Sequence, residues 1–423
     1  MYYDMYFLLL LAMERMLFME KKYRQLELLG WTFTITPMRF FLTGLALICL
    51  GTIIVRLVTG YQYVTNLTDE TPWGLWIAFD VMTGVALAGG GYSTALLVHS
   101  FDYKKYRVVA RGALLTSLFG YILVMVGLFL DIGQWYNFWR PFVSWGYSSV
   151  LFEVFWCVSI YTTILSLEFC EVLTERIAKS YHLKVLKILP ILIIIGLIFP
   201  MMHQSSLGGL FLLFKAKMYP LWWSEFLPLY FLLSSFFVGS AMVCVETDLA
   251  RRGYAHEVPH NVLKRLTRVG GRVMVAYLLL KLYDLTVQNQ WGLLLENSLQ
   301  SNLYIVEMVF GIIIPICLIF SSIVNTRRGL MLYSWLTVGG VVLNRMNNVF
   351  TSMYTNGNYF PSVWEFIVSI GLISIGCLIY CFIVENFKVI GDEYAVQVRV
   401  QNANNSGLQV WSSSAQQVFE DKK

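Results

Sequence analysis

Long apolar segments separated by short polar loops dominate the hydrophobic pattern of this chain. The hydrocarbon core of a bilayer is about 30 Å thick, so a helix needs about 20 mostly apolar residues to cross it. Ten segments are long enough, and they cover residues 39–59, 73–98, 108–130, 147–170, 184–203, 224–245, 268–288, 302–324, 331–354 and 362–385. The pattern therefore predicts an all-α polytopic membrane protein with about ten transmembrane helices.

The two ends of the chain differ from this transmembrane domain, which we place at residues 39–388. Residues 6–13 are apolar but too short to span a bilayer, and charged residues follow them without a small-residue cleavage site. We therefore expect no cleaved signal peptide and interpret residues 1–38 as a cytoplasmic or interfacial segment. Residues 389–423 turn polar and are predicted to form a cytoplasmic tail.

The distribution of Lys and Arg predicts the orientation of the helices. Cytoplasmic loops carry an excess of these residues. Loops 99–107, 171–187, 246–268 and 325–330 hold fourteen of them, whereas the alternate loops hold only Arg56, Arg140, Lys215 and Lys217. The first set of loops is therefore predicted to be cytoplasmic, with both termini on the same side.

Composition excludes several classes of protein. The chain is 57% hydrophobic and 13% charged with a net charge of +5, and no run of basic residues suggests nucleic-acid binding. None of the seven cysteines forms a CxxC pair, so we expect neither a zinc site nor an iron–sulfur cluster in this chain. The five histidines lie in loops or at opposite helix ends, where no two could face one haem, so we also expect no haem b.

Ionisable and polar residues inside the apolar segments are the main functional signal. A charge at the centre of a membrane helix costs about 2.5–3.5 kcal/mol on insertion scales, so such residues usually face a bundle interior or a cavity. Five of them share one depth, the outer third of the predicted bilayer: Asp80, Tyr121, Glu153, His203 and Arg345. The common depth favours a functional pocket, and the alternative that each is a separately paired structural group stays open.

The inner half contains a sparser polar set. Glu168, Glu246 and Arg111 are the candidates there for a proton path, and Glu168 lies deepest. The alternative for Glu168 is an ion pair with a nearby arginine.

The predicted outer loops are rich in aromatic residues, namely Trp135, Trp139, Trp145, Trp222, Trp223, Trp291 and Tyr359. Aromatic residues gather at both membrane interfaces, and long ordered loops often bind a partner. The pattern fits an interfacial belt and a docking surface equally well.

At these residues the chain resembles the NrfD/PsrC family of polysulfide-reductase membrane subunits, and most closely its HybB-like members in respiratory complexes. The matching stretches are Pro72-Trp-Gly-Leu-Trp-Ile-Ala-Phe-Asp80, Ser117-Leu-Phe-Gly-Tyr121, Ser149-Val-Leu-Phe-Glu153, Leu167-Glu-Phe169, Pro200-Met-Met-His-Gln-Ser-Ser206, Pro220-Leu-Trp222, the region of Glu246, Arg345, and Tyr359-Phe-Pro-Ser-Val-Trp-Glu365. The block around His203 is the most specific of these. Residues 1–38 have no match.

The resemblance implies ten helices built around two four-helix bundles, without a prosthetic group. It also implies a quinone site near the outer face, beneath a periplasmic iron–sulfur subunit of ferredoxin type. Family positions suggest Asp80, Tyr121, Glu153 and His203 around the quinone, with Arg345 in a supporting position and Glu246 on the inner side. One departure is Gln134, where relatives carry a basic residue, which puts docking or quinone contacts in question.

The sequence therefore predicts a quinone-binding membrane subunit that passes electrons between a periplasmic iron–sulfur subunit and menaquinone. It would sit with further catalytic or cytochrome subunits in a bacterial or archaeal cytoplasmic membrane. His203 and Tyr121 are plausible partners of the quinone carbonyls, and Asp80 and Glu153 are plausible proton carriers. An inner half-channel through Glu168, Glu246 and Arg111 toward Glu153 would couple this chemistry to proton translocation.

Two other functions are less compatible with the sequence. A secondary transporter usually has a pair of broken helices at corresponding positions of two halves. No such pair is apparent, and Gly89-Gly90-Gly91 is interpreted as a site of close helix packing. A passive membrane anchor would have little use for several buried acids.

Overall fold

The computed structural model describes residues 24–28, 30–68, 75–97, 106–254, 258–353, 359–387 and 389. Its main helices are α2 (Pro37–Thr59), α3 (Leu75–Leu87), α4 (Gly90–Ala95), α5 (Arg107–Asp131), α7 (Val150–Arg176), α8 (Lys179–Leu210), α9 (Leu227–Tyr254), α10 (His260–Val287), α11 (Leu299–Met308), α12 (Ile314–Phe320), α13 (Arg327–Met346) and α14 (Val363–Asn386). Shorter elements are α6 (Arg140–Val143), the 3₁₀ turns η1 (Tyr61–Tyr63), η4 (Trp135–Asn137), η5 (Phe211–Phe214), η6 (Trp291–Leu295) and η8 (Ile323–Asn325), and the π-helical turns η7 (Val309–Ile313) and η9 (Asn347–Thr351). Each of the ten predicted segments coincides with a helix or with consecutive helical pieces, so the all-α polytopic prediction is confirmed.

Within the described residues, seven helical stretches are both long and apolar enough to cross a membrane. They are 37–59, 108–131, 150–176, 180–214, 227–254, 299–320 and 363–386. The other three predicted segments also form helices. One is divided between α3 and α4, and α10 and α13 are less apolar because they carry buried polar side chains such as Lys281 and Asn344.

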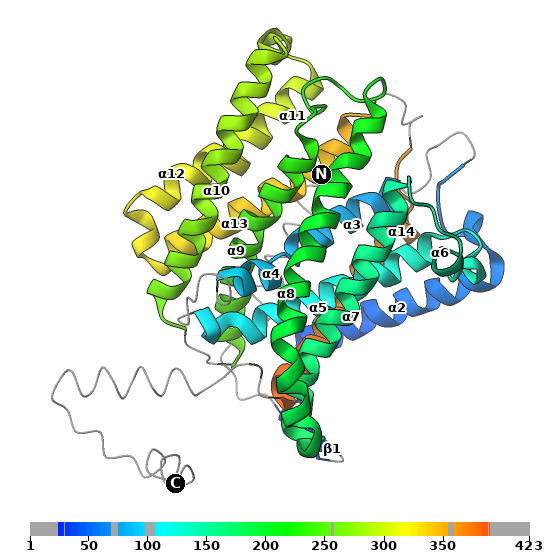
Figure 1. Cartoon of the computed structure of the whole chain (residues 1–423). Helices are drawn as coiled ribbons and strands as arrows, with labels where there is room; N and C mark the ends of the chain where they lie inside the picture. The colour runs from blue at the N-terminus through cyan, green and yellow to red at the C-terminus, as the bar shows by residue number, and fades with distance from the viewer. Residues whose placement is uncertain are drawn as a thin grey trace, which may run out of the picture.

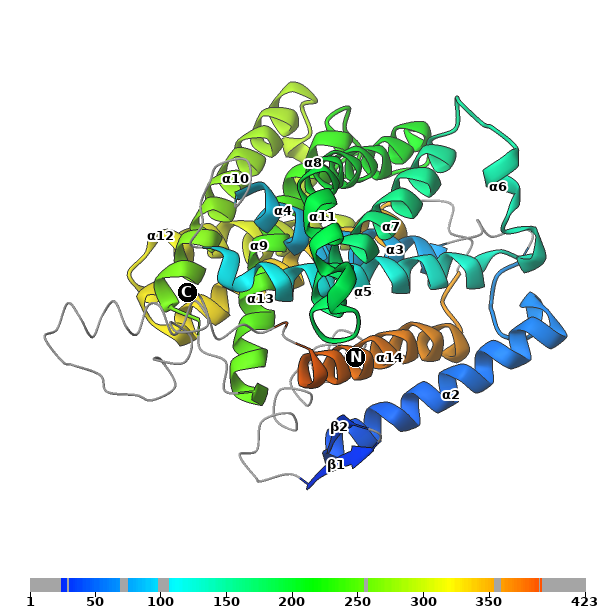
Figure 2. The same ribbon diagram turned by 60° about the horizontal axis from the view of Figure 1, so that its bottom comes forward.

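The helices form two four-helix bundles, as the family resemblance implied (Figure 1). The first consists of α3–α4, α5, α7 and α8, and the second of α9, α10, α11–α12 and α13. Helix α9 packs against both bundles, because it contacts α3, α4 and α8 as well as α10 and α13. Helices α2 and α14 pair on the flank of the first bundle (Figure 2). We keep the words outer and inner for the helix ends that the charge distribution assigns to each side.

The second predicted segment is not one continuous helix, because it is interrupted at Ala88–Gly89 between α3 and α4. The hydroxyl of Ser117 compensates for this break, since it donates to the Ala88 carbonyl and accepts from the Gly91 amide at 2.8 Å. The interpretation of the glycines as a close packing site is confirmed. A Cβ on Gly239 of α9 would lie 2.6 Å from the Gly89 carbonyl carbon, so the two backbones touch there.

The N-terminal segment contains a β-hairpin that the hydrophobic pattern did not predict. Strands β1 (Arg24–Leu28) and β2 (Trp31–Ile35) pair antiparallel around Gly30, whose φ of 81° favours glycine. The hairpin lies against the inner ends of two helices: Thr32 N–H donates to Asn386 at 2.8 Å, and Arg176 stacks 4.5 Å from the Trp31 ring. The apolar segment 6–13 and the tail from residue 390 onward lie outside the described residues.

Candidate functional site

Tyr121 and His203 form a closed pair in the interior of the first bundle. Tyr121 lies on α5, His203 lies on α8, and neither side chain is exposed. The Tyr121 hydroxyl lies 2.7 Å from His203 Nε2, and His203 Nδ1 lies 2.9 Å from the Phe199 carbonyl. A carbonyl oxygen can only accept, so Nδ1 carries the proton and Nε2 accepts from Tyr121. Nε2, which carries no proton, is therefore the basic nitrogen of the ring.

Tyr161 of α7 completes the walls around this pair, and sequence reasoning missed it. Its ring packs edge-on against Tyr121 with centroids 4.7 Å apart, and it lies 6.3 Å from the His203 ring. The signal was present in the spacing, because Tyr161 shares one face of α7 with Glu168. Three helices of the first bundle therefore meet at the Tyr121–His203 pair.

Gln204 is next to His203 and carries an unusual buried amide. Its side chain is fully buried, and within the described residues neither Nε2 nor Oε1 makes a well-formed hydrogen bond, although the amide lies close enough to interact with the Tyr121 hydroxyl. Buried polar groups without partners are rare, and each calls for an explanation such as an absent ligand or water. An amide offers both a donor and an acceptor, so the surroundings of His203 fit a ligand with carbonyl or hydroxyl oxygens.

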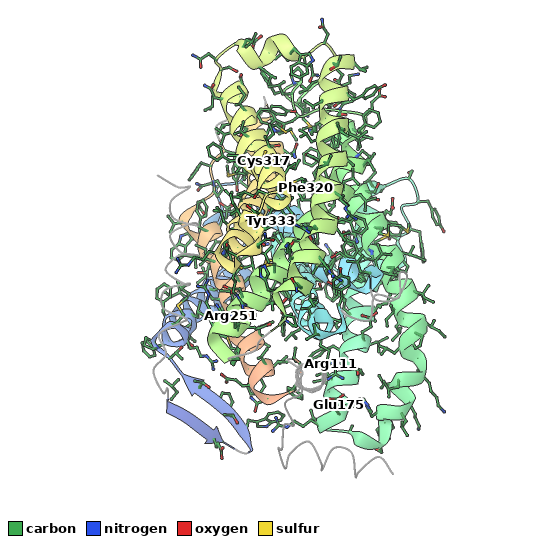
Figure 3. The ribbon with its side chains drawn as sticks, turned by 90° about the vertical axis from the view of Figure 1, so that its left-hand side faces the viewer. Arg111, Glu175, Arg251, Cys317, Phe320 and Tyr333 are labelled. Atoms are coloured by element: carbon green, nitrogen blue, oxygen red, sulfur yellow. The ribbon has the colours of Figure 1, made fainter. Side chains whose placement is uncertain are left out.

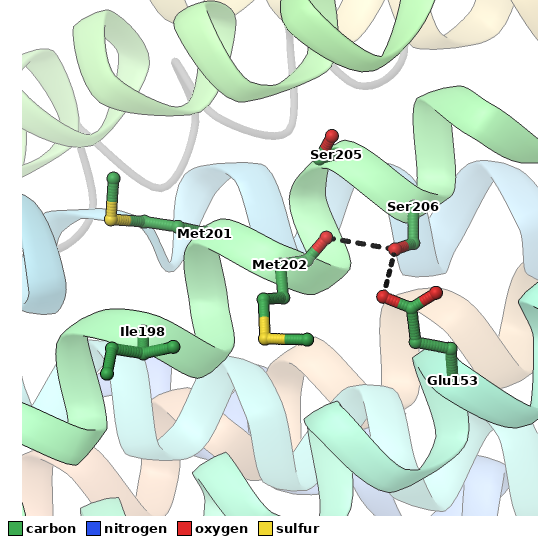
Figure 4. A pocket seen from close by; sticks show the side chains of 6 residues that line it. All are labelled: Glu153, Ile198, Met201, Met202, Ser205 and Ser206. Carbon is green, nitrogen blue, oxygen red and sulfur yellow. Dashed lines mark hydrogen bonds between the residues drawn. The ribbon is translucent and has the colours of Figure 1, made fainter.

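Glu153 is not part of this buried pair and lies in an open groove between α7 and α8 (Figure 4). Ser206 donates to Glu153 Oε1 at 2.7 Å and to the Met202 carbonyl at 3.0 Å. The groove has a volume of ≈ 430 Å³ and is lined by Glu153, Ile198, Met201, Met202, Ser205 and Ser206. Ile198 is 52% exposed and Met202 is 43% exposed, so the groove opens on the lateral surface of the bundle.

Asp80 faces a different neighbour. Ser369 of α14 donates a hydrogen bond to Asp80 Oδ2, which ties α3 to the flanking helix. Within the described part of the chain, no hydrogen bond links Asp80 or Glu153 to Tyr121 or His203. The structure thus brings two of the four predicted residues into direct contact, and a single cavity lined by all four remains a prediction.

Arg345 belongs to the second bundle. Its guanidinium donates to Asn344 Oδ1 at 2.6 Å and to Ser234 Oγ at 2.5 Å, and it lies 3.7 Å from the centroid of the Phe231 ring. Ser234 and Phe231 are on α9, the helix that packs against both bundles. Arg345 is thereby tied to α9, and its own helix α13 also contacts α3 of the first bundle.

The inner candidates have different surroundings. Arg111 of α5 forms ion pairs of 2.7 Å with Glu171 and Glu175 of α7, near the inner end of the first bundle (Figure 3). Glu246 accepts a hydrogen bond from the Tyr380 hydroxyl at 2.7 Å. Glu168 is buried, and the described residues give it neither an ion pair nor a hydrogen bond. In the described structure Glu168 is therefore not paired with an arginine.

Glu168 and Tyr161 of α7 both lie against Gly196 of α8. Glu168 Oε1 lies 3.1 Å from the point where a Cβ on Gly196 would sit, and Tyr161 Cε2 lies 3.8 Å from the same point. The glycine of α8 thus lets Glu168 and Tyr161 approach each other.

The outer aromatic residues divide into two groups. The interpretation of Trp222 and Tyr359 as belt or docking residues was wrong, because Trp222 is fully buried and donates to Glu307 at 3.0 Å, and Tyr359 donates to Glu365 at 2.7 Å. Trp139 and Trp145, in contrast, are 50% and 58% exposed. A tryptophan in an outer loop can therefore belong to the buried core or to the exposed surface.

Asp131 and its neighbours lie at the outer end of the first bundle. Tyr61 donates to Asp131 Oδ1 at 2.7 Å, and Arg56 lies 4.4 Å from the centroid of the Tyr61 ring. Burial, together with the charge of Asp131, raises the pKa of Tyr61, so this hydroxyl remains a donor. Gln134, where a basic residue was expected, is exposed and accepts from Asn137 at 2.7 Å.

Comparison with known proteins agrees with this architecture. The family model described as "Polysulphide reductase, NrfD" matches residues 63–356. The chain belongs to the NrfD family. The match covers most of both bundles, so the resemblance inferred from the sequence motifs is confirmed.

Three relatives illustrate the breadth of this family. A protein of Nitratidesulfovibrio vulgaris is 34% identical over 82% of this chain and 93% of its own length. The probable Ni/Fe-hydrogenase 2 b-type cytochrome subunit of Escherichia coli is 31% identical over 82% of this chain and 90% of its own length. The integral membrane subunit of menaquinone reductase from Nitratidesulfovibrio vulgaris is 26% identical over 52% of this chain and 55% of its own length.

Proposed function

We propose that this protein is the quinone-reactive membrane subunit of a respiratory oxidoreductase, and that it passes electrons between a partner's iron–sulfur chain and menaquinone. The buried Tyr121–His203 pair beside the buried amide of Gln204 carries this proposal. Membership of the NrfD family and similarity to a menaquinone reductase subunit support it.

The chain offers hydrogen-bonding groups of the kind that quinone chemistry needs. Reduction of a quinone to a quinol requires protons as well as electrons, so its oxygens must meet donors and proton carriers. Gln204 supplies an amide donor, and the Tyr121 hydroxyl, which donates to His203 in this structure, would turn from His203 to donate to a quinone oxygen. Glu153 lies where the lateral groove meets the bundle, and its apolar lining of Ile198 and Met202 suits an isoprenoid chain.

Asp80 has a less direct role in this proposal. Its side chain is hydrogen-bonded to Ser369 of α14 and not to the Tyr121–His203 pair. We therefore assign Asp80 to proton supply at the outer side.

The proposal also includes an orientation and a partner. A periplasmic ferredoxin-like iron–sulfur subunit would dock on the outer face, next to the exposed Trp139 and Trp145. Both termini would lie in the cytoplasm of a bacterial or archaeal cell, in agreement with the distribution of Lys and Arg. Further catalytic or cytochrome subunits would complete the complex.

The two alternatives are less well supported. The described helices contain interruptions at Ala88–Gly89 and at Val309–Ile313, but they affect the first helix of one bundle and the third helix of the other. They are therefore not the paired discontinuities typical of secondary transporters. A passive anchor would not need the closed Tyr121–His203 pair.

The test is extraction of bound quinone from the purified complex, combined with a menaquinone reduction assay. We expect menaquinone in the extract, and we expect Tyr121→Phe to lower the reduction rate because it removes the donor to His203 while it keeps the ring packing against Tyr161. Tyr136→Phe, which changes an exposed tyrosine of the outer loop, is the matched control. Absence of quinone together with full activity of Tyr121→Phe would contradict the proposal.

A further inference from the structure

The second bundle contains a buried polar cluster that the proposed function does not use. Its charged members are Lys281 of α10, Glu307 of α11 and Arg345 of α13, and each is at most 3% exposed. Such residues inside a membrane bundle are costly and usually functional. Each of these charges must therefore be stabilised by its neighbours.

Among the described residues Lys281 makes no hydrogen bond and no close ion pair, and the carboxylates of Glu307 and Asp284 attract its charge only from a greater distance. Its Nζ lies 4.4 Å from the centroid of the Tyr230 ring, 5.8 Å from that of Tyr304 and 6.0 Å from that of Tyr277. Each cation–π contact of this kind is weak compared with the free energy that an ammonium group loses when it is removed from water. The aromatic cage therefore offsets only part of the cost of a charged lysine.

Glu307 does not neutralise Lys281 by a direct contact, because neutral donors occupy its oxygens. Asn344 donates to Glu307 Oε1 at 2.7 Å, and Asn347 and Trp222 donate to Oε2 at 2.8 and 3.0 Å. The second carboxylate near Lys281 belongs to Asp284 of the same helix, which accepts from Gln288 at 2.6 Å.

Arg345 is likewise bonded only to neutral groups, Asn344 and Ser234. An arginine keeps its proton in proteins, whereas a buried lysine changes its protonation readily. Lys281 is therefore the cation of this cluster whose charge can vary, and Arg345 is a fixed positive charge beside it.

The two bundles share one helix order. Each consists of four consecutive helices, so α5 corresponds to α10, α7 to α11–α12 and α8 to α13. By this order, Tyr121 and Lys281 both lie on the second helix of a bundle, and His203 and Arg345 both lie on the fourth.

Two separate hydrogen bonds, made by adjacent serines of α9, reach α13 on one side and the first bundle on the other. Arg345 donates to Ser234 at 2.5 Å, and the hydroxyl of the next residue, Ser235, is hydrogen-bonded to Tyr92 of α4 in the first bundle. Gly239 brings the α9 and α4 backbones into contact one turn further along. A change of charge in either bundle can therefore alter the contacts that α9 makes with the other bundle.

We propose that Lys281, in its cage beside Glu307, is a proton-exchanging site of the second bundle that is coupled to quinone reduction in the first. The amine takes up one proton from the inner side when electrons reach the first bundle and releases that proton to the outer side when the quinol leaves. Lys281 itself is neither oxidised nor reduced over the cycle. This inference rests on the proposed quinone chemistry.

The experiment uses the complete complex in proteoliposomes, with reduced viologen as electron donor and menaquinone as acceptor. Quinone reduction and membrane potential are measured together for wild type, Lys281→Met, Lys281→Arg and Glu307→Gln. Lys281→Arg keeps the positive charge but cannot release a proton, so it separates a fixed charge from proton exchange. Lys264→Met, at the inner end of the same helix, is the matched control.

We expect Lys281→Met and Lys281→Arg to continue quinone reduction with a reduced potential per electron, and Glu307→Gln to shift the pH dependence of the potential. Lys264→Met should behave as wild type. Full potential in Lys281→Met, rescue by Lys281→Arg, or no potential in an active wild type would each overturn the inference. If both Lys281 variants fail to assemble, an unchanged pH dependence in Glu307→Gln overturns it instead. An inactive wild type would contradict the proposed function itself, so the two failures are distinguishable.

Discussion

Two kinds of polar residue occur in the first bundle, and they predict different effects of mutation. Tyr121 and His203 are sealed inside and bonded to each other, so they can act only on a ligand that reaches them. Glu153 is half-buried in a groove that opens sideways, and its one side-chain partner in the described structure is the Ser206 hydroxyl. An acid in that position can exchange protons with its surroundings.

Replacement of Glu153 by Gln tests this role. The amide keeps the size of the side chain and can still accept from Ser206, so we expect the complex to assemble normally. It cannot exchange a proton, so menaquinone reduction should fall by about 10²-fold or more, as for loss of a general acid–base group. The assay compares reduction rates of purified complexes, with the exposed Glu225→Gln as control. Loss of assembly would make Glu153 a structural residue.

Residue depth was predictable from the sequence, but rotation about each helix axis was not. Depth follows from counting at 1.5 Å per residue, and it correctly placed Tyr121 and His203 at one level. It gave no information on which neighbouring helix a side chain faces. In the structure Asp80 faces α14 and Arg345 faces α9. Lys281 was missed although it interrupts an apolar segment, which is the same signal that identified Asp80.

At the level of elements, glycines determine how closely the helices approach. Gly340 of α13 packs on Gly311 of η7, and a Cβ on Gly311 would lie 2.8 Å from Gly340 Cα. The π-helical turn η7 widens α11–α12 at this crossing. The long apolar segment 302–324 predicted a helix there, but a hydrophobic pattern does not distinguish π from α turns.

The adjacent glycines of α13 provide a matched pair of substitutions. A Cβ on Gly340 would overlap the Gly311 backbone, whereas a Cβ on Gly339 meets nothing within 4 Å. We expect Gly340→Ala to destabilise the protein by about 1–3 kcal/mol, the usual cost of overpacking. Gly339→Ala should be neutral or stabilising by up to about 1 kcal/mol, because alanine favours helix. Thermal unfolding in detergent measures both, and equal midpoints would refute the close contact.

The hairpin and the helix break were the elements that hydrophobic periodicity did not reveal. Strands β1 and β2 are short and half-polar, and they are held by contacts from Arg176 and Asn386, which are far away in sequence. The break at Ala88–Gly89 is stabilised by Ser117 of another helix. Both depend on tertiary partners, which a local pattern does not contain.

For the whole molecule, the arrangement of histidines predicts the optical spectrum. The name of the Escherichia coli relative includes a b-type cytochrome. In this chain both ring nitrogens of His203 are engaged, by Tyr121 and by the Phe199 carbonyl, and His260 is bonded to the Val324 carbonyl. We expect the purified subunit to show no Soret band and no iron by elemental analysis. A Soret band that His203→Gln abolishes would contradict this prediction.

The direction of proton uptake is a property of the entire bundle. Protons taken from the outer side, where electrons would also enter from the proposed iron–sulfur partner, would leave quinone reduction electrically silent. Protons that cross from the inner side would generate a membrane potential. Glu168, which is buried and unpaired in the described structure, lies between the inner ion pairs of Arg111 and the Tyr161 ring. It is the best placed carrier for such a crossing, with Glu246 as a second inner acid.

Glu168→Gln decides between these two directions. The amide preserves the shape beside Gly196 but removes proton exchange, so proteoliposomes should continue to reduce menaquinone while the potential per electron falls. Glu27→Gln, in the exposed part of the hairpin, controls for a change of charge at the inner side. An unchanged potential would remove Glu168 from the proton path, and no potential even in wild type would refute an inner half-channel. Because Tyr161 separates Glu168 from His203, a path through Glu168 should also be interrupted by Tyr161→Phe, which keeps the ring packing and loses only the hydroxyl.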